Sequence, residues 1–414
     1  MEDILECCCG LDVHKESIVA CLLKGPVRAE LKPQSEIREF GTQLKDLIAL
    51  RKWLEKHECH YVAMESTGIY WQPVYAVLET ALSDEMRLLV VNARHMKNVP
   101  GKKTDMRDAE WIATLLRAGL LKGSFVPERD IRDLRQFTRY RKALIRDITS
   151  QKNRIEKLLQ SNGFRLSSFL SDIFGSSGLA IMHQLVQVGS ISSQSMDLCL
   201  KARARQKAYE ILSSLNGTLS VPQRKLLKMQ LAHLVDLQAN LQEVEEEIHD
   251  GFSQFQSPIE LLDSIPGIDL TAAYAILAEI GKEMSAFPTA QHICSWAGLA
   301  PGNHKSANKQ KRQRVTQGNN YLKTILCEVA WVIASHKKLY LSGWYWRLKQ
   351  HTDAKRAIVA LARKLLVIIY TMLKSNQPYN EQKFVERKNA SEQKRVKRMV
   401  YELSQLGYAV SLAA

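Results

Sequence analysis

The segment CCGLDVHKESIVACLL, residues 8–23, has two apolar runs on either side of the polar sequence HKES. Each run has the length of a β-strand, and polar residues between two such runs are typical of a turn. We therefore predict a β-hairpin. Asp12 interrupts the first run, where a charged side chain is costly unless it binds something. Asp12 is thus the first candidate for a functional residue.

Helix-like and strand-like patterns alternate after this hairpin. Amphipathic periodicity predicts helices over 39–56, 68–82 and 105–118. Two short apolar runs, YVAME at 61–65 and MRLLVVN at 86–92, predict buried strands. This order of elements predicts an α/β domain with a mixed sheet that carries helices on its faces.

The chain has 414 residues and a net charge of +15, with a pI near 9.4. At roughly 100–200 residues per domain, this length predicts two or three domains. The longest apolar run, residues 365–373, is shorter than the roughly 20 residues that span a bilayer, and the N-terminus lacks a signal-peptide pattern. We expect a cytoplasmic protein with no membrane partner, whose eight cysteines are reduced thiols. Its charge predicts a polyanionic partner.

The positive charge is concentrated in three parts of the chain. Residues 284–327 contain no acid, and residues 383–398 contain seven basic residues against two acids. Exposed helices usually mix both signs, so such stretches indicate contact with nucleic-acid phosphates. The candidates in the acid-free stretch are Lys305, Lys309, Lys311, Arg312 and Arg314.

The third basic part is a predicted helix from about residue 127 to 162. Basic residues at spacings of three and four place one charged stripe along it. A solvated face is the usual interpretation, but five like charges repel along a stripe, so we favour contact with phosphates. The stripe comprises Arg132, Arg135, Arg139, Lys142 and Arg146.

Residues 163–217 show no clear period and predict only an irregular, mostly helical insertion. From residue 227, apolar residues recur at alternating spacings of three and four over three heptads. This seam predicts either a coiled coil for self-association or a helix packed inside a bundle. Its members are Leu227, Gln230, Leu234, Leu237, Leu241, Val244 and Ile248.

Three more carboxylates stand at the ends of predicted elements. Glu65 ends the run YVAME, and Asp105 and Asp108 are three residues apart at a helix start. Each alone could be a helix cap, a salt-bridge partner or a turn residue. Together with Asp12, in an α/β domain of a basic protein, they predict a site for two Mg²⁺ ions. Mg²⁺ prefers oxygen ligands, and two ions can clamp both oxygens of an in-line phosphoryl transfer.

A second candidate site lies in and before the acid-free stretch. Residues 259–280 predict two helices joined by a Pro-Gly hairpin, which either presents backbone N–H groups to a phosphate or is an ordinary turn. Ser306 lies in the polar loop 302–317, among basic residues. Its hydroxyl could act as a nucleophile where cations stabilise a phosphorane, although most loop serines have no such role.

Several motifs resemble the transposases of IS110-type (IS110/IS1111) insertion sequences. GKKTDMRDAEWIATLLRAGLL at 101–121 is similar to the KTDxxDAxxIAxLL signature of that family. Upstream, GLDVHKESIVACLL and AMESTGIYWQPV match its first two acidic motifs. Downstream, IPGIDLTAAYAILAEIG, FPTAQHICSWAGLAPGNHKSANK and QGNNYLKTIL match its C-terminal transposase domain in order and spacing. The resemblance covers nearly the whole chain.

The resemblance implies a RuvC-like, RNase H-related fold in which Asp12, Glu65, Asp105 and Asp108 form the family's DEDD tetrad. Ser306 falls where the family has its nucleophilic serine, although Ala307 stands where many relatives have glycine. The implied activity is DNA cleavage and strand exchange with a covalent phosphoserine intermediate.

The same resemblance implies cofactors and partners. These are Mg²⁺, with two ions per site, and a noncoding bridge RNA that pairs with target and donor DNA. The tetrad and the serine of one site would come from different protomers of a homo-oligomer, a dimer to a tetramer.

The implied domain order has four parts. A RuvC-like catalytic domain spans 1–125, and a basic helical linker with a coiled coil spans 126–255. A mainly helical C-terminal transposase domain with the serine spans 256–380, and a basic helical tail spans 381–414.

Two other functions remain open. A RuvC-like junction-cleaving nuclease would need the tetrad but not Ser306, and would leave no protein–DNA adduct. A non-catalytic nucleic-acid-binding protein would keep the carboxylates as relics, and the presence of all four acids argues against it.

Overall fold

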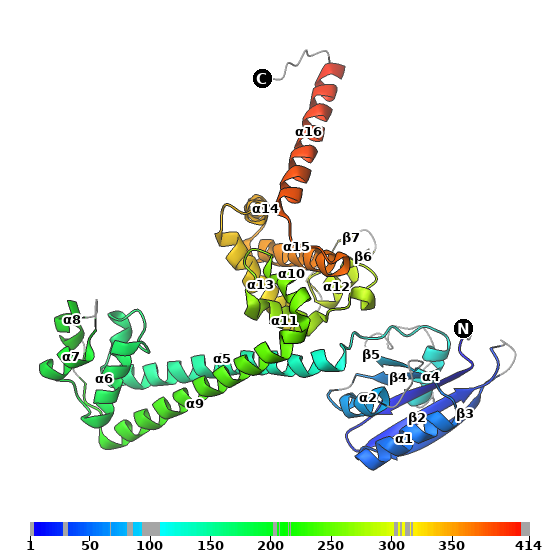
Figure 1. Ribbon diagram of the computed structural model, residues 1–414, viewed down its shortest axis with the longest axis horizontal. Helices are drawn as coiled ribbons and strands as arrows, with labels where there is room; N and C mark the ends of the chain where they lie inside the picture. Colours follow the sequence, from blue (N-terminus) through cyan, green and yellow to red (C-terminus); the bar gives the residue numbers. More distant parts are fainter. Residues whose placement is uncertain are drawn as a thin grey trace. The chain divides into compact units, whose positions relative to one another are not determined.

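The computed structural model of the protein consists of two compact units, Met1–Val126 and Pro127–Ala414 (Figure 1). It describes residues 4–27, 32–66, 68–80, 86–92, 108–201, 205–206, 208–213, 215, 217–301, 305–306, 309–310, 315 and 318–406. For residues 305, 306, 309, 310, 387, 388 and 391 it describes the backbone alone. No helix within these ranges combines the length and apolar character needed to cross a lipid bilayer.

The first unit is built on a five-stranded mixed sheet with the strand order β3-β2-β1-β4-β5. β1 (Cys7–Val13) and β2 (Ser17–Lys24) form the predicted antiparallel hairpin. β4 (Tyr61–Glu65) pairs parallel to β1, and β5 (Arg87–Val91) pairs parallel to β4. The predicted mixed sheet is therefore confirmed, and each of the predicted strands is present.

A further strand, β3 (Gln34–Gly41), pairs antiparallel to β2 and was not predicted. The helix predicted over 39–56 is α1 and begins only at Leu44 (Leu44–Lys56), so its predicted start was wrong. β3 forms one edge of the sheet, and most of its side chains are exposed. It therefore lacks the apolar alternation that identifies a half-buried strand in a sequence.

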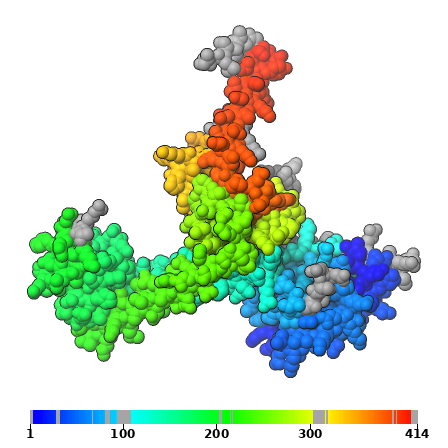
Figure 2. All heavy atoms as spheres, in the orientation of Figure 1, coloured from blue at the N-terminus to red at the C-terminus, as the bar shows by residue number. Residues whose placement is uncertain are grey.

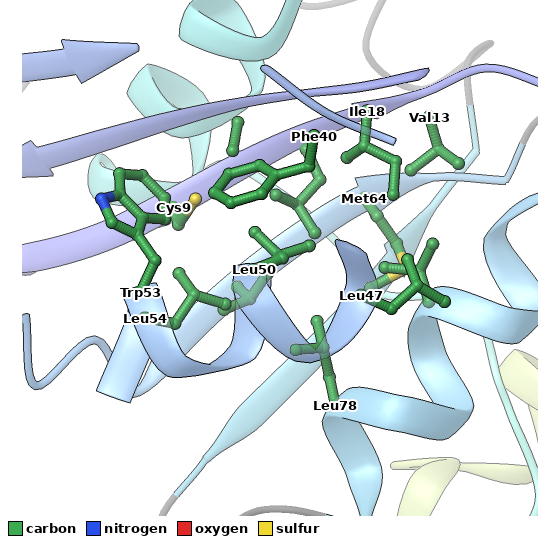
Figure 3. Packing of buried hydrophobic residues seen from close by; sticks show 14 of the residues in the cluster. Cys9, Val13, Ile18, Phe40, Leu47, Leu50, Trp53, Leu54, Met64 and Leu78 are labelled. Carbon is green, nitrogen blue, oxygen red and sulfur yellow. The ribbon is translucent and has the colours of Figure 1, made fainter. Parts of the chain in front are cut away.

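The sheet buries a different core on each face. On one face, α1 and α2 (Trp71–Glu79) cover a cluster that includes Leu11, Met64 and Trp53 (Figure 3). On the other face, α4 (Asp108–Arg117) covers a cluster that includes Cys8 and Ala63. Because strand side chains alternate between faces, the even-numbered residues of β1 face α4.

α4 lies directly on β1 because Gly10 has no side chain. A methyl group added at Gly10 would overlap the carbonyl oxygen of Ala109 and the amide nitrogen of Ala113. The other end of the helix is also tied to the start of β1, since the Arg117 guanidinium donates to the carbonyl of Glu6 at 3.1 Å. α4 therefore runs antiparallel to β1, with its N-terminus toward the end of the strand that carries Asp12.

In the second unit, α5 (Arg129–Ser161) and α9 (Val221–Phe252) pack antiparallel along their length (Figure 1). The Arg141 guanidinium donates to the Glu245 carboxylate at 2.8 Å, and the Gln151 amide donates to the Gln230 carbonyl at 2.9 Å. Most of the predicted heptad seam of α9 is buried inside this chain, and Leu227 and Leu234 belong to its core. The seam therefore packs within a bundle, and self-association through it stays a prediction.

Short helices pack against the far end of this pair. They surround a core that includes Ile155 of α5 and Leu227 of α9. This part is mostly helical, as the sequence predicted for 163–217. Its elements are η1 (Leu166–Ser168), α6 (Ser176–Gln187), α7 (Ser193–Cys199) and α8 (Ala208–Ser213).

A helical bundle follows α9, with α15 (Ala354–Ser375) at its centre. α15 buries ten side chains and packs against α10, α12, α13 and α14. α16 (Glu381–Gln405) follows α15. The other elements are η3 (Ser253–Phe255), α10 (Gln256–Asp263), α11 (Leu270–Ile280), η4 (Met284–Ala286), α12 (Ala290–Trp296), β6 (Lys305–Ser306), β7 (Lys309–Gln310), α13 (Asn320–Ser335) and α14 (Tyr340–Lys349).

The close approach at Gly10 predicts the effect of adding one methyl group. Gly10→Ala should lower the free energy of unfolding of the first unit by about 1–3 kcal/mol, because the overlapping atoms are backbone and cannot rotate away. Hydrogen exchange of the β1 and α4 amides measures this decrease.

Gly343→Ala is the matched control. No heavy atom lies within 4 Å of the place where its methyl group would be added in α14. This substitution should stabilise its helix by about 0.5–1 kcal/mol. Unchanged exchange of β1 and α4 in Gly10→Ala would contradict the close packing.

Candidate active site

Asp12 and Glu65 lie at the same end of two neighbouring parallel strands. The register pairs Leu11 of β1 with Met64 of β4, and Asp12 and Glu65 are the next residues of those strands. Leu11 and Met64 belong to the core beneath α1 and α2, so the residues that follow them occupy the opposite, α4-covered face. The sheet thus brings two of the four predicted carboxylates to one place.

Asp108 approaches the same place from α4. It is the first residue of the helix and is exposed, while the next residue, Ala109, contacts Gly10. Gly10 precedes Asp12 by two residues on the same face of the sheet. The N-terminus of α4, which carries a partial positive charge, therefore lies toward Asp12 and favours anionic groups there.

The fourth predicted carboxylate, Asp105, lies outside the described residues. Within the described ranges, no three His, Cys, Asp or Glu side chains are grouped closely enough to hold a metal ion. The three described acids are nevertheless oxygen donors of the type that Mg²⁺ prefers, from three elements that converge at one end of the sheet. Metal binding by these four residues stays a prediction.

His14 contacts the candidate site, which the sequence did not indicate. Its Nε2 atom lies 3.2 Å from Oδ2 of Asp12, whose side chain is 18% exposed. His14 is not among the four carboxylates that the sequence predicted for this site. Its position in the turn after β1, two residues from Asp12, was the one available signal.

The second candidate residue, Ser306, lies in the two-stranded ribbon β6-β7, where it pairs with Lys309. The two ends of its loop are held together, since Pro301 pairs with Val315 and the N–H of Asn319 donates to the carbonyl of Trp296 at 3.2 Å. The Ser306 side chain is outside the described part of the structure, so its nucleophilic role stays a prediction. The same holds for the five basic residues of this loop, Lys305, Lys309, Lys311, Arg312 and Arg314.

A buried carboxylate, Glu279 of α11, joins three helices of the second unit. Its side chain is 3% exposed and accepts two hydrogen bonds from Arg139 of α5, both at 2.8 Å. It accepts a third, at 2.6 Å, from the amide of Asn319, whose own oxygen caps the N-terminus of α13. Glu279 thus fixes the helix that directly follows the Ser306 loop.

Arg135 completes this cluster from α5. Its guanidinium donates to the backbone carbonyls of Ala278 and Glu279 at 2.8 and 2.9 Å. Burial lowers the pKa of Arg135 to about 10, although the nearby Glu279 carboxylate opposes this shift. The side chain is still cationic at neutral pH, so the cluster places two positive charges beside one buried negative charge.

The predicted phosphate-binding stripe on α5 has partners inside the chain. Arg135 and Arg139 both contact Glu279, a carboxylate 140 residues from Arg139 that offsets their mutual repulsion, and their contact with phosphates stays a prediction. Lys142 also faces an acid, with Nζ 3.7 Å from Glu328 of α13, and Arg132 donates to the Pro127 carbonyl. Of the five residues, Arg146 is the exposed one, and its contact with nucleic acid stays a prediction.

The Pro-Gly hairpin predicted within 259–280 is present between α10 and α11. A hollow of about 670 Å³ lies beside it, lined by Pro266, Gly267 and residues 335–339. Those residues include His336, Lys337 and Lys338. Phosphate binding at this hairpin stays a prediction.

Comparison with known proteins assigns both units to one family. A profile of IS110-type DEDD transposases, described as "Transposase", matches residues 9–162, and the profile "Transposase IS116/IS110/IS902 family" matches residues 259–345. Together they cover more than half of the chain. The chain belongs to the IS110 family of insertion-sequence transposases. It is therefore a DNA-processing enzyme of the transposase class.

Individual relatives agree with this assignment. The chain is 24% identical to the "Transposase for insertion sequence element IS1111A" of Coxiella burnetii, over 70% of this chain and 72% of that protein. It is 24% identical to a "Probable family 20 transposase" of Pseudomonas aeruginosa, over 89% of this chain and 94% of that protein. It is 32% identical to the "Pilin gene-inverting protein" of Moraxella bovis, over 29% of this chain and only 38% of that protein.

The Glu279 cluster predicts a large effect of a small substitution. Glu279→Gln keeps the side-chain size but leaves Arg135 and Arg139 without their counter-charge. The free energy of unfolding of the region around α11 should fall by about 3 kcal/mol. This value is the lower end of the range for a broken buried ion pair, and we choose it because the Arg139 side chain is 38% exposed. Hydrogen exchange of the α11 amides measures it.

Glu245→Gln provides the control, because it also removes the carboxylate partner of an arginine of α5. It removes an ion pair between Glu245 and Arg141 in which the Glu245 side chain is 45% exposed. Exposed pairs contribute at most about 1 kcal/mol. Equal effects of the two substitutions would show that Glu279 does not hold this bundle together.

Proposed function

We propose that this transposase cleaves and exchanges DNA strands in the cytoplasm by metal-dependent phosphoryl transfer, with Ser306 as nucleophile and a bridge RNA as guide. The observation that carries the proposal is the convergence of Asp12, Glu65 and the N-terminus of α4 at one end of the sheet. The mixed sheet with helices on both faces supports the RuvC-like fold that the family resemblance implies.

In this proposal Asp12, Glu65, Asp105 and Asp108 hold two Mg²⁺ ions. The bound ions would supply charge stabilisation to both the attacking and the leaving oxygen of the phosphate. Asp108 is exposed, so a phosphate could approach it, and the partial positive charge of the helix N-terminus would favour that anion. His14 would hold the Asp12 carboxylate from the solvent side.

The serine step is a transesterification. The Ser306 oxygen forms a bond to phosphorus while the bond from phosphorus to one deoxyribose oxygen breaks, and the serine proton leaves with that oxygen. A hydroxyl from another strand then attacks the phosphoserine, and the serine oxygen departs with a proton. The number of phosphodiester bonds is conserved, so strand exchange needs no external energy source.

Two observations support a recombinase rather than a simple nuclease. Ser306 lies in the β6-β7 ribbon of a loop whose two ends are joined by the hydrogen bond from Asn319 to Trp296. This bond supports a fixed position for the serine. The name of the Moraxella relative describes inversion of a gene, and inversion requires that cut strands be rejoined. A junction-cleaving nuclease and a non-catalytic binding protein are the alternative functions.

The proposed partners are donor DNA, target DNA, the bridge RNA and further copies of this chain. Arg146, which is exposed, would contact phosphates, and so would the basic residues of the loop around Ser306. The composite site, with tetrad and serine from different protomers, follows the family resemblance and requires at least a dimer.

The tetrad is tested by substitutions that keep side-chain size. We expect cleavage of the element's own DNA ends to fall by more than about 100-fold in each of four variants, Asp12→Asn, Glu65→Gln, Asp105→Asn and Asp108→Asn. Removing a residue that only contacts a metal ligand costs about 10–100-fold, so loss of a ligand itself should cost more. Nucleic-acid binding should survive. Strand cleavage and gel-shift assays with the element's RNA measure the two properties separately.

Glu16→Gln is the matched control, because Glu16 is an exposed acid in the turn of the same hairpin. It should cleave normally. Full activity in any two of the four tetrad variants would remove the metal assignment.

Ser306→Ala decides between the recombinase and the nuclease. If the serine oxygen attacks phosphorus, this variant should form no covalent adduct and exchange no strands, while RNA binding persists. Removal of one hydroxyl from this two-stranded ribbon should change stability by at most about 0.5 kcal/mol. Denaturing gel electrophoresis of the protein with labelled DNA detects the adduct.

Mixing Ser306→Ala with Asp12→Asn tests the composite site. Each mixed assembly could combine an intact tetrad with an intact serine from another protomer, so some exchange should return. An adduct formed by Ser306→Ala alone would exclude Ser306 as the nucleophile.

A further inference from the structure

α16 is an exposed helix that contacts the bundle only near its start, within the described part of the second unit. Phe384 stacks between Tyr340 and Tyr379, with ring centroids at 5.7 and 5.5 Å, and the N–H of Tyr340 donates to the Glu381 carboxylate. No described residue of α16 is buried. Figure 1 shows α16 continuing past α14 and α15, and Figure 2 shows its side chains without a neighbouring element beside them in this view.

The basic residues of α16 gather on one side of the helix. Lys394 lies 11 residues, or three turns, after Lys383, and Lys397 and Arg398 follow Lys394 by three and four residues. These spacings place all four cations on one side. All four are exposed, and together they extend over about 22 Å of helix.

The opposite side carries most of the apolar residues. Val385, Val396, Met399 and Leu403 are separated by 11, three and four residues, and Val385 lies two residues after Lys383. A helix turns about 100° per residue, so a shift of two residues moves to the far side. The four cations therefore lie away from these apolar residues, with one acid, Glu386, on their own side three residues after Lys383.

The protein itself does not neutralise this basic face. Arg398 pairs with Glu402 at 2.8 Å, but their side chains are 80% and 56% exposed, so the pair contributes little. Among the interactions of the described residues, no acid pairs with Lys383, Lys394 or Lys397. Four exposed cations on this side against two acids, Glu386 and Glu402, leave a net positive charge that fits an extended polyanion.

We propose that the basic face of α16, formed by Lys383, Lys394, Lys397 and Arg398, binds the phosphodiester backbone of a nucleic-acid duplex. Duplex DNA carries one negative charge per about 1.7 Å of its axis, so about 22 Å of helix meets several phosphates. This site lies outside the residues that the family profiles match. The inference rests on the proposed function only in that the protein acts on nucleic acid.

A membrane surface fits this helix less well. Helices that bind in a bilayer interface usually carry a large apolar side with Trp, Phe or Leu. The apolar side of α16 has one such residue, Leu403, and is interrupted by the acid Glu392, while Phe384 packs against two tyrosines of the bundle. Backbone recognition needs no base contacts, so the face should bind sequences alike.

The test compares two variants of the full-length protein that remove the same number of charges. Glutamine keeps good helix propensity, and α16 is outside the core, so neither substitution set should disturb the bundle. The probes are a 30-base-pair duplex DNA and an RNA hairpin of equal length, measured by fluorescence anisotropy over a range of KCl concentrations. The α16 variant is Lys383→Gln, Lys394→Gln, Lys397→Gln, Arg398→Gln, and the control, on exposed positions of β2 and α1, is Lys24→Gln, Lys45→Gln, Lys52→Gln, Lys56→Gln.

The α16 variant should bind at least tenfold more weakly than the wild type. The slope of log K against log salt should flatten by about 0.9 for each duplex-DNA phosphate that the variant no longer binds. The control should keep the wild-type slope. Weaker binding of DNA alone assigns the face to DNA, weaker binding of the hairpin alone assigns it to RNA, and weaker binding of both assigns it to either backbone.

Equal slopes for both variants would overturn the proposal. So would weaker binding to vesicles of phosphatidylserine and phosphatidylcholine with unchanged binding of both nucleic acids. The assay requires no cleavage, so an inactive metal site or an inert Ser306 would leave its result unchanged. A failure here and a failure of the proposed reaction are therefore distinguishable.

Discussion

The contact between α4 and the backbone of β1 at Gly10 sets the position of Asp108 relative to the strand ends that carry Asp12 and Glu65. Without a side chain at Gly10, the helix approaches until Ala109 and Ala113 touch the strand. Asp12 follows Gly10 by two residues, and Asp108 precedes Ala109 by one. A larger residue at Gly10 would lift the helix and move Asp108 away from the strand end. The packing of α4 on Gly10, two residues before Asp12, therefore sets the distance between Asp108 and the strand end.

Glu279 has the corresponding role in the second unit. A buried carboxylate is costly unless it is paired, and here two arginines and an asparagine satisfy it. Because those donors come from α5 and the start of α13, one acid connects the long helix pair to the segment that carries Ser306. In both units, the residues proposed for chemistry depend on a neighbouring contact that performs no chemistry itself.

Local sequence patterns were sufficient for most of the first unit. The strands β1, β2, β4 and β5 are buried, and their apolar runs identified them. β3 was missed because an edge strand exposes its side chains and does not show the apolar signal. Asp12 and Glu65 stood out because acids at the ends of apolar runs are unusual. Their proximity depends on the parallel register of β1 and β4, which no local pattern contains.

The internal partner of the basic stripe on α5 was missed for the same reason. The count of like charges was correct, but the compensating Glu279 is 140 residues away in sequence. One signal was present, since Glu279 is the sole charged residue of the apolar helix LTAAYAILAEI. A single acid in such a helix needs a partner, and the candidates were Arg135 and Arg139, which have no acid three or four residues away in their own helix. The lone acid of α11 and the two arginines of α5, considered together, would have predicted the contact of Glu279 with Arg139.

The most direct test is whether the first unit binds a divalent metal at its carboxylates. Electron paramagnetic resonance can follow Mn²⁺ titrated into the nucleic-acid-free protein, with Mg²⁺ as competitor. A metal site at these carboxylates predicts Mn²⁺ binding that Mg²⁺ displaces, that Asp12→Asn abolishes and that Glu16→Gln retains. Identical Mn²⁺ binding by the wild type and Asp12→Asn would contradict it.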